Sequence, residues 1–223
     1  MSKTSPLKAV IVPVTPFQQN CSIIWCAETL QGAIVDPGGE TDKLIAAVAQ
    51  RGIVIEKILI THAHLDHAGG AAALAEHFAV PIEGPHRADQ LLIDTIEELG
   101  AQYGMPECRY FTPDRWFDDG DTVTVGAQNF AIRHCPGHAP GHVIFVHEAA
   151  RLAFIGDVLF QGSIGRTDLP GGDHEALIRS VVTKLWPFGD DITFVPGHGA
   201  ISNFGEERRT NPFVSDRVLS AGR

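Results

Sequence analysis

An apolar strand that leads directly into a histidine-rich segment is the feature that most limits how this chain can fold. Residues Ile53 to Ile60 are mostly β-branched and apolar, which is typical of a strand buried on both faces. The next residues, Thr61-His62-Ala63-His64-Leu65-Asp66-His67, contain three imidazoles and a carboxylate. Zinc and similar divalent ions prefer these ligands. We therefore expect a core strand whose end carries a metal site.

The spacing within this segment divides the candidate ligands into two pairs. His62 and His64 are two residues apart, so they would point to the same side of an extended chain. Asp66 and His67 come where we expect the chain to turn into a helix beginning near Ala68. A single histidine is more often a surface or core residue than a ligand. Four ligand residues within six positions favour a metal site, and the second pair could serve a second ion.

A second ion needs more ligands than one segment supplies, and further candidates occur later in the chain. Pro-Gly-His occurs three times, ending at His138, His142 and His198. The first and third copies follow expected strands, although Pro-Gly is itself a turn signal and one copy could be an ordinary turn. Asp157 directly follows an apolar strand. Its carboxylate could cap a turn or helix, or it could bridge two cations.

Apolar periodicity predicts strands and helices mixed along the whole chain. Thr41 and Asp173 are the expected N-caps of two helices, and residues 100–117 are expected to be irregular. No linker or low-complexity segment divides the sequence, and its length permits one large α/β domain or two small ones. The polar motifs follow strand ends, where open α/β folds place their sites. We expect strands over residues 7–14, 21–26, 32–35, 53–60, 80–83, 122–125, 129–134, 142–147, 152–155 and 192–195, and helices over 41–50, 68–78, 88–99 and 173–185.

Charge and composition limit the partners of the protein. The 223 residues carry a formal net charge of −10, which argues against a nucleic-acid partner because phosphate binding needs a basic face. No apolar run reaches the ~20 residues that span a bilayer, so no membrane partner is expected. The first residues lack the apolar core of a signal peptide, and the four cysteines form no CxxC pair. We expect a cytoplasmic protein with reduced thiols, whose oligomeric state these features leave open.

Four motifs follow one another in a recognisable order: T-H-x-H-x-D-H, P-G-H-x-P-G-H, G-D-x-L-F-x-G-x-x-G-R-x-D and P-G-H-G. Together they resemble the metallo-β-lactamase superfamily, and within it the glyoxalase II-like branch of hydroxyacylglutathione hydrolases in its short bacterial form. The resemblance runs from about the first strand to Phe213. It implies an αββα sandwich of two mixed sheets with helices on the outer faces. It also implies a single domain over residues 1–223, without the C-terminal helical segment that recognises glutathione in longer glyoxalase II enzymes.

The resemblance also implies a role for each matching residue. His62, His64 and His138 would hold a first divalent ion, and Asp66, His67 and His198 would hold a second. Asp157 would bridge the two ions, for which we expect zinc, with iron or manganese also compatible. His142 would not be a ligand: it would either support the ligands from a buried position beside them or be a structural histidine. Arg166 and Asp168 would order the loop behind Asp157.

The implied reaction is hydrolysis of a small-molecule acyl thioester such as S-lactoylglutathione. Two ions ~3.5–4 Å apart would share a water molecule, lower its pKa and stabilise the oxyanion formed at the carbonyl. Asp66 would orient the resulting hydroxide, and Asp157 would act with it as a catalytic residue. The chain has no G-x-S-x-G motif, which fits a nucleophile that is not a serine.

Alternative functions depend on how the same residues are used. A persulfide dioxygenase-like enzyme would hold one iron through His62, His138 and Asp157. A non-catalytic scaffold would have lost some ligands, and none of the seven is lost. A secreted β-lactamase would need a signal peptide, and a nuclease would need a basic face. Three arginines could partly replace the missing glutathione-binding segment or form a solvated basic cluster: Arg208, Arg209 and Arg217.

Overall fold

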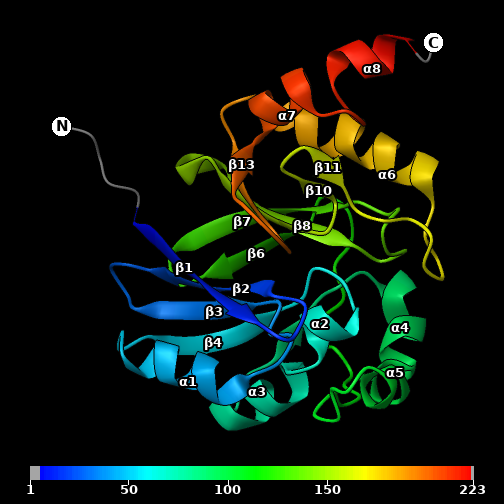
Figure 1. Cartoon of the computed structure of the whole chain (residues 1–223). Coiled ribbons are helices and arrows are strands. Elements are labelled where there is room, and N and C mark those ends of the chain that lie inside the picture. The colour runs from blue at the N-terminus through cyan, green and yellow to red at the C-terminus, as the bar shows by residue number, and fades with distance from the viewer. Residues whose placement is uncertain (1–5, 222–223) are drawn as a thin grey trace.

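Two β-sheets lie face to face between layers of helices in the computed structural model, which describes residues 6–221 (Figure 1). The ends of the expected 1–223 domain, and most of the amino-terminal stretch that lacks a signal-peptide pattern, therefore lie outside the described residues. The first sheet has the strand order β1-β2-β3-β4-β5 and the second has the order β13-β12-β9-β8-β7-β6. A separate hairpin is formed by β10 (Leu159–Phe160) and β11 (Ser163–Ile164).

The first sheet is mixed. Its first two pairings, β1 with β2 and β2 with β3, are antiparallel, whereas β3 with β4 and β4 with β5 are parallel. The carboxyl ends of β3 and β4 therefore reach the same edge of the sheet. Its strands are β1 (Leu7–Val14), β2 (Gln19–Cys26), β3 (Gln31–Val35), β4 (Val54–Leu59) and β5 (Ile82–Glu83).

The second sheet is mixed as well. β8 pairs antiparallel with both β7 and β9, and β9 pairs parallel with β12, so β7, β9 and β12 run in the same direction. The carboxyl ends of these three strands also meet at one edge. The strands are β6 (Thr122–Val125), β7 (Gln128–His134), β8 (Val143–His147), β9 (Leu152–Gly156), β12 (Thr193–Pro196) and β13 (Ser202–Asn203).

Helices cover the outer face of each sheet (Figure 1). α1 (Thr41–Ala49) and α3 (Ala71–Phe78) lie against the first sheet, and α6 (His174–Ser180) and α7 (Phe204–Thr210) lie against the second. This arrangement confirms the expected αββα fold. The remaining helices are α2 (Leu65–Ala68), α4 (Gln90–Asp94), α5 (Ile96–Gln102) and α8 (Asp216–Ala221).

Three apolar layers hold these four layers of secondary structure together. Ile58 of β4 packs in the layer under α1 and α3, whereas its neighbour Leu59 packs between the sheets. β4 is therefore buried on both faces, as its β-branched sequence predicts. Between the sheets lie large aromatic side chains, each contributing about 1.5–3 kcal/mol through burial. They are Phe117, Phe130, Phe145 and Phe154.

The helix expected over residues 68–78 is wrong in its start and in its continuity. Helix α2 already begins at Leu65, so Asp66 and His67 lie on its first turn. The chain then breaks, and α3 begins at Ala71. The break is needed because Gly70 donates its N–H to the carbonyl of Pro37, and a Cβ at Gly70 would lie 2.7 Å from that oxygen.

Two other expectations about helices need correction. The helix predicted over 88–99 consists of a 3-10 turn at Arg87–Asp89 followed by α4 and α5, because Thr95 Oγ1 donates back to the carbonyls of Leu91 and Leu92 at the break. Thr41 is not an N-cap. The cap position is Glu40, whose side chain accepts from the Thr15 N–H instead of capping α1.

The second long helix agrees better with the sequence. Asp173 caps α6 by accepting a hydrogen bond from the Ala176 N–H, as predicted. The helix continues beyond Ser180 as a π-helical turn over Val181–Leu185. The apolar pattern did not predict the β10–β11 hairpin, β13, α7 or α8, whose short lengths give little periodicity.

Gly38 should tolerate no side chain. A Cβ there would lie 1.6 Å from the carbonyl oxygen of Asp66, and a backbone atom cannot move away as a flexible side chain can. We expect Gly38→Ala to lower the free energy of unfolding by about 3 kcal/mol through overpacking. Gly39→Ala is the matched control, because its Cβ would meet only ordinary contacts at 3.4 Å or more. Equal urea midpoints for the two variants would contradict this expectation.

Candidate metal centre

The seven side chains predicted to hold metal lie together at one edge of the two sheets. His62 and His64 follow β4, Asp66 and His67 lie on α2, and His138 follows β7. Asp157 directly follows β9, and His198 is the second residue after the end of β12. Because β7, β9 and β12 run in the same direction, their carboxyl ends deliver these residues to a common place. Segments more than 130 residues apart in sequence thus form one cluster.

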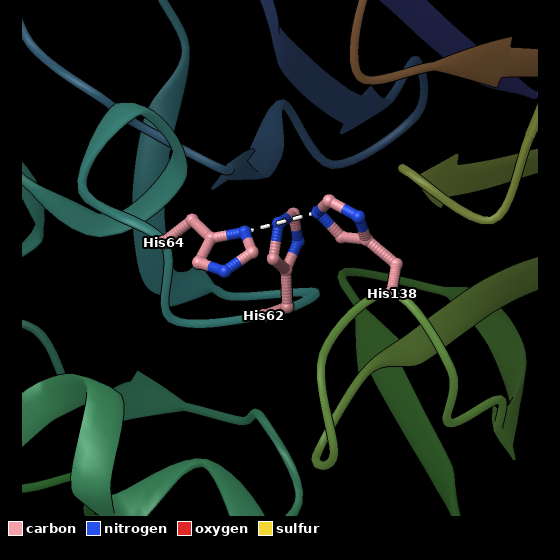
Figure 2. A group of neighbouring side chains, drawn as sticks. All are labelled: His62, His64 and His138. Atoms are coloured by element: carbon pink, nitrogen blue, oxygen red, sulfur yellow. Dashed lines mark hydrogen bonds between the residues drawn. The ribbon is translucent and has the colours of Figure 1, made fainter. Parts of the chain in front are cut away.

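His62, His64 and His138 form the first group within this cluster. Figure 2 shows their rings converging, with His64 Nδ1 and His138 Nε2 2.9 Å apart. The possible ligand atoms of all three lie within 4.8 Å of one another. Burial lowers the pKa of each imidazole, that of His64 to about 3. The rings are therefore neutral, which is the form that binds a cation.

Asp66, His67 and His198 form the second group. Asp66 Oδ2 lies 3.2 Å from His198 Nε2 and 3.9 Å from His67 Nε2. Burial would raise the pKa of Asp66, but the facing histidines hold it below its ordinary value. Burial would lower the pKa of His198, but Asp66 and Asp157 raise it. This group therefore combines carboxylate and imidazole, whereas the first group is purely imidazole.

Asp157 lies between the two groups. Its Oδ1 is 3.3 Å from His67 Nε2, and its Oδ2 is 3.5 Å from His138 Nε2 and 3.6 Å from His198 Nε2. Burial alone would raise the pKa of Asp157, but these imidazoles, His67 foremost, hold it well below its usual range. One carboxylate thus faces members of both groups.

Oxygen atoms behind the histidines fix the orientation of their rings. Asp36 Oδ2 lies 2.9 Å from His67 Nδ1, the Arg166 carbonyl 2.8 Å from His138 Nδ1 and the Phe17 carbonyl 3.1 Å from His198 Nδ1. Each oxygen can accept a hydrogen bond from the Nδ1–H of its ring, which leaves Nε2 as the nitrogen that faces the centre.

The donor set fits divalent metal ions. Three buried polar atoms of the cluster have no hydrogen-bond partner: His62 Nε2, His67 Nε2 and Asp157 Oδ1. Leaving such atoms unpaired is costly, and one or two cations would satisfy all three. Imidazoles together with carboxylates suit Zn, Fe and Mn alike.

Asp36 is a residue of this centre that the sequence interpretation missed. In the sequence it only opens the turn-forming stretch Asp36-Pro37-Gly38-Gly39. In the structure it is buried and accepts from Thr61 N at 2.7 Å, from Thr61 Oγ1 at 2.6 Å and from His67 Nδ1 at 2.9 Å. It also lies near enough to His62 and His67 to form a third possible metal group. Because its oxygens already accept these three bonds, we interpret it as a support. Its place at the end of β3, parallel to β4, is the signal that could have indicated it.

The other predicted residues lie around the centre. His142 is buried, stacks on the His62 ring with centroids 4.5 Å apart, and accepts from the Asp157 N–H at 3.0 Å. Arg166 and Asp168 form an exposed ion pair with each other at 2.7 Å. Arg166 contacts the cluster through its backbone carbonyl and not through its guanidinium.

Comparison with known proteins agrees with this geometry. Residues 14–198 match the family model described as "Metallo-beta-lactamase superfamily". The chain belongs to the metallo-β-lactamase superfamily. It is 47% identical over 208 residues to "Hydroxyacylglutathione hydrolase GloC" of Haemophilus influenzae, covering 93% of this chain and 98% of that protein. This confirms the resemblance noted in the sequence and shows that the protein is a hydrolytic metalloenzyme.

Solved structures of superfamily members match the whole fold. BLEG-1 B3 metallo-beta-lactamase is 32% identical with a TM-score of 0.86, and the match covers 93% of this chain and 99% of that chain. TTHA1623 in a di-iron-bound form is 35% identical with a TM-score of 0.83, covering 92% and 100%. In residues 6–221 no helix has the length and apolar character needed to cross a membrane.

The Asp36 contacts should contribute measurably to stability. Asp36 has φ 52°, a left-handed conformation that asparagine adopts more readily than alanine, so Asp36→Asn changes the hydrogen bonding with little backbone strain. The amide offers one acceptor oxygen to three donors, and we expect a loss of about 2 kcal/mol in the free energy of unfolding of the metal-free protein. Asp42→Asn, at an exposed position on α1, is the control. A denaturant titration in which both variants unfold like the wild type would exclude this role.

Proposed function

We propose that the protein is a thioester hydrolase of the glyoxalase II type, acting on S-lactoylglutathione or a similar small acyl thioester. The observation that carries the proposal is the pair of histidine-containing groups that share Asp157 at the edge of the sheets. The name of the Haemophilus influenzae relative supports the glutathione thioester as the first substrate to test.

The proposed ligands are the residues of these two groups. His62, His64 and His138 would hold one ion, Asp66, His67 and His198 the other, and Asp157 would contact both. The three buried atoms without hydrogen-bond partners support this assignment. We propose zinc as the metal, and the di-iron form of TTHA1623 makes iron the first alternative.

The residues around the ligands define the chemistry. Bound divalent ions would lower the pKa of a water molecule and stabilise negative charge on a carbonyl oxygen. Asp66 and His198 are the accessible side of the second group, with side chains 17% and 28% exposed. Asp66 would therefore be placed to accept a hydrogen bond from an attacking water molecule and to orient it toward the substrate carbonyl. A thiolate leaves readily, so the chain needs no strong acid near the sulfur.

Two of the three arginines near the carboxyl end are engaged in ion pairs. Arg208 pairs with Asp190 and Asp216, and Arg209 pairs with Glu206. We therefore propose that the centre acts on the thioester bond, and we assign no glutathione contact to Arg208 or Arg209. We also propose a cytoplasmic location, which the four buried free thiols support, and one domain for the described residues, whose two sheets share an apolar layer.

Removing one imidazole of the first group tests the ligand assignment. We expect His64→Ala to stay folded, because His64 is only half-buried, but to lose bound metal and at least about 100-fold in thioester hydrolysis. Elemental analysis, circular dichroism and a thioester assay measure these three properties. His77→Ala, at an exposed position on α3, is the control. Full activity with unchanged metal content in His64→Ala would overturn the assignment.

A substrate panel tests the reaction itself. We expect the metal-loaded protein to hydrolyse S-lactoylglutathione or a glutathione-free acyl thioester, because the centre supports attack on an activated carbonyl. The same preparation would be tested with a β-lactam and, on an oxygen electrode, with glutathione persulfide. Oxygen uptake without thioester cleavage would replace the proposal by a persulfide dioxygenase, and β-lactam cleavage alone would replace it by a lactamase.

A further inference from the structure

Asp89 is a buried carboxylate that the sequence did not single out and that the proposed reaction does not use. It ends the 3-10 turn Arg87–Asp89 and has no exposed surface. No basic side chain forms an ion pair with it within residues 6–221. Its Oδ2 accepts from the Ala63 N–H at 2.9 Å, and its Oδ1 accepts from the Gly141 N–H. A buried carboxylate without a cation is costly, so this arrangement requires an explanation.

The two donors lie in the two segments that carry the first group of histidines. Ala63 stands between His62 and His64, and Gly141 is three residues after His138. These segments are 26 residues before and 52 residues after Asp89 in the chain. One side chain therefore spans the gap between the two backbones whose histidines must face a common point.

Neighbouring backbone bonds make this connection rigid. The His86 N–H donates to the Gly141 carbonyl at 3.0 Å, and the Asp89 N–H donates to the His86 carbonyl at 3.0 Å. On the other side, the Val143 N–H donates to the Thr61 carbonyl at 2.8 Å. Asp89 thus completes a closed set of hydrogen bonds around the two segments, and it is the only side chain in this set.

We propose that Asp89 is a positioning residue that sets the spacing between the His62–His64 segment and His138, and thereby the metal affinity of this group. The inference rests on the proposed assignment of these histidines as ligands. A carboxylate offers two acceptor oxygens, which match the two backbone donors. A carboxamide of the same shape offers one acceptor and would place an N–H₂ group against the other donor.

Asp89→Asn therefore removes one arm of the connection without changing its size. The probe is Zn²⁺ alone, added to metal-free protein in competition with a chelator of known affinity. Two backgrounds separate the groups: His198→Ala leaves the first group intact, and His64→Ala leaves the second. In the His198→Ala background we expect Asp89→Asn to weaken binding about 10- to 100-fold, as for other supports of metal ligands. In the His64→Ala background we expect less than about a threefold change.

A control and a second variant keep the test decisive. Asp94→Asn, an exposed position on α4, should leave both affinities unchanged. Equal weakening in the two backgrounds, or none, would overturn the inference, because a merely structural role acts on both groups alike. If Asp89→Asn does not fold, Asp89→Glu replaces it, because it keeps both oxygens but moves them by one methylene. The criterion is again the weakening of Zn²⁺ binding in the His198→Ala background compared with that in the His64→Ala background.

The outcome is separable from that of the proposed function. The affinity measurement uses no substrate, so a protein that cleaves no thioester can still show the expected difference in Zn²⁺ affinity between the two backgrounds. A parent protein that binds no divalent ion would refute the ligand assignment, and a parent that binds Zn²⁺ normally while Asp89→Asn binds equally well would refute only the role of Asp89.

Discussion

The centre depends on the direction of the strands that end at it. β3 and β4 run parallel, so Asp36 at the end of one strand reaches Thr61 at the end of the other. In the opposite sheet, β9 and β12 run parallel and deliver Asp157 and His198 together. Because the two sheets pack through a shared apolar layer, both edges meet as one cluster. The apolar core and the polar centre are therefore consequences of a single packing arrangement.

The balance between burial and nearby carboxylates differs between the two groups, and so do the pKa values of their histidines. The purely imidazole group loses protons because burial lowers the pKa of His62, His64 and His138, and their lone pairs face one another. In the second group, burial is outweighed by carboxylates, which raise the pKa of His67. The two groups contain buried polar atoms without hydrogen-bond partners, and a cation bound there would satisfy them and so couple metal binding to folding stability.

The sequence revealed those parts of the centre that are local. The apolar run before Thr61 predicted a core strand, and the histidine-rich segment, the repeated Pro-Gly-His and Asp157 supplied the candidate ligands. The family resemblance then assigned seven of them to two ions. Asp36 and Asp89 were not predicted, because each acts on backbone at least 25 residues away and neither has a neighbouring ligand in sequence. The predicted helix limits failed for a related reason. Gly70 and Thr95 lie at helix breaks that are set by a backbone contact and by side-chain back-bonding, which an apolar period does not contain.

The same geometry explains which side of the centre a substrate meets. The His198 side chain is 28% exposed, whereas that of His138 is 3% exposed, so the second group faces outward and the first lies deeper. The aromatic side chain of Phe160 borders the outward side, with its ring centroid 6.3 Å from that of His198. Phe17 contacts His198 through its backbone carbonyl. Arg166, whose carbonyl holds His138, is neutralised by Asp168. The outward side is thus bordered by the Phe160 ring, and the uncharged acyl group of the proposed thioester substrate would meet an apolar surface there.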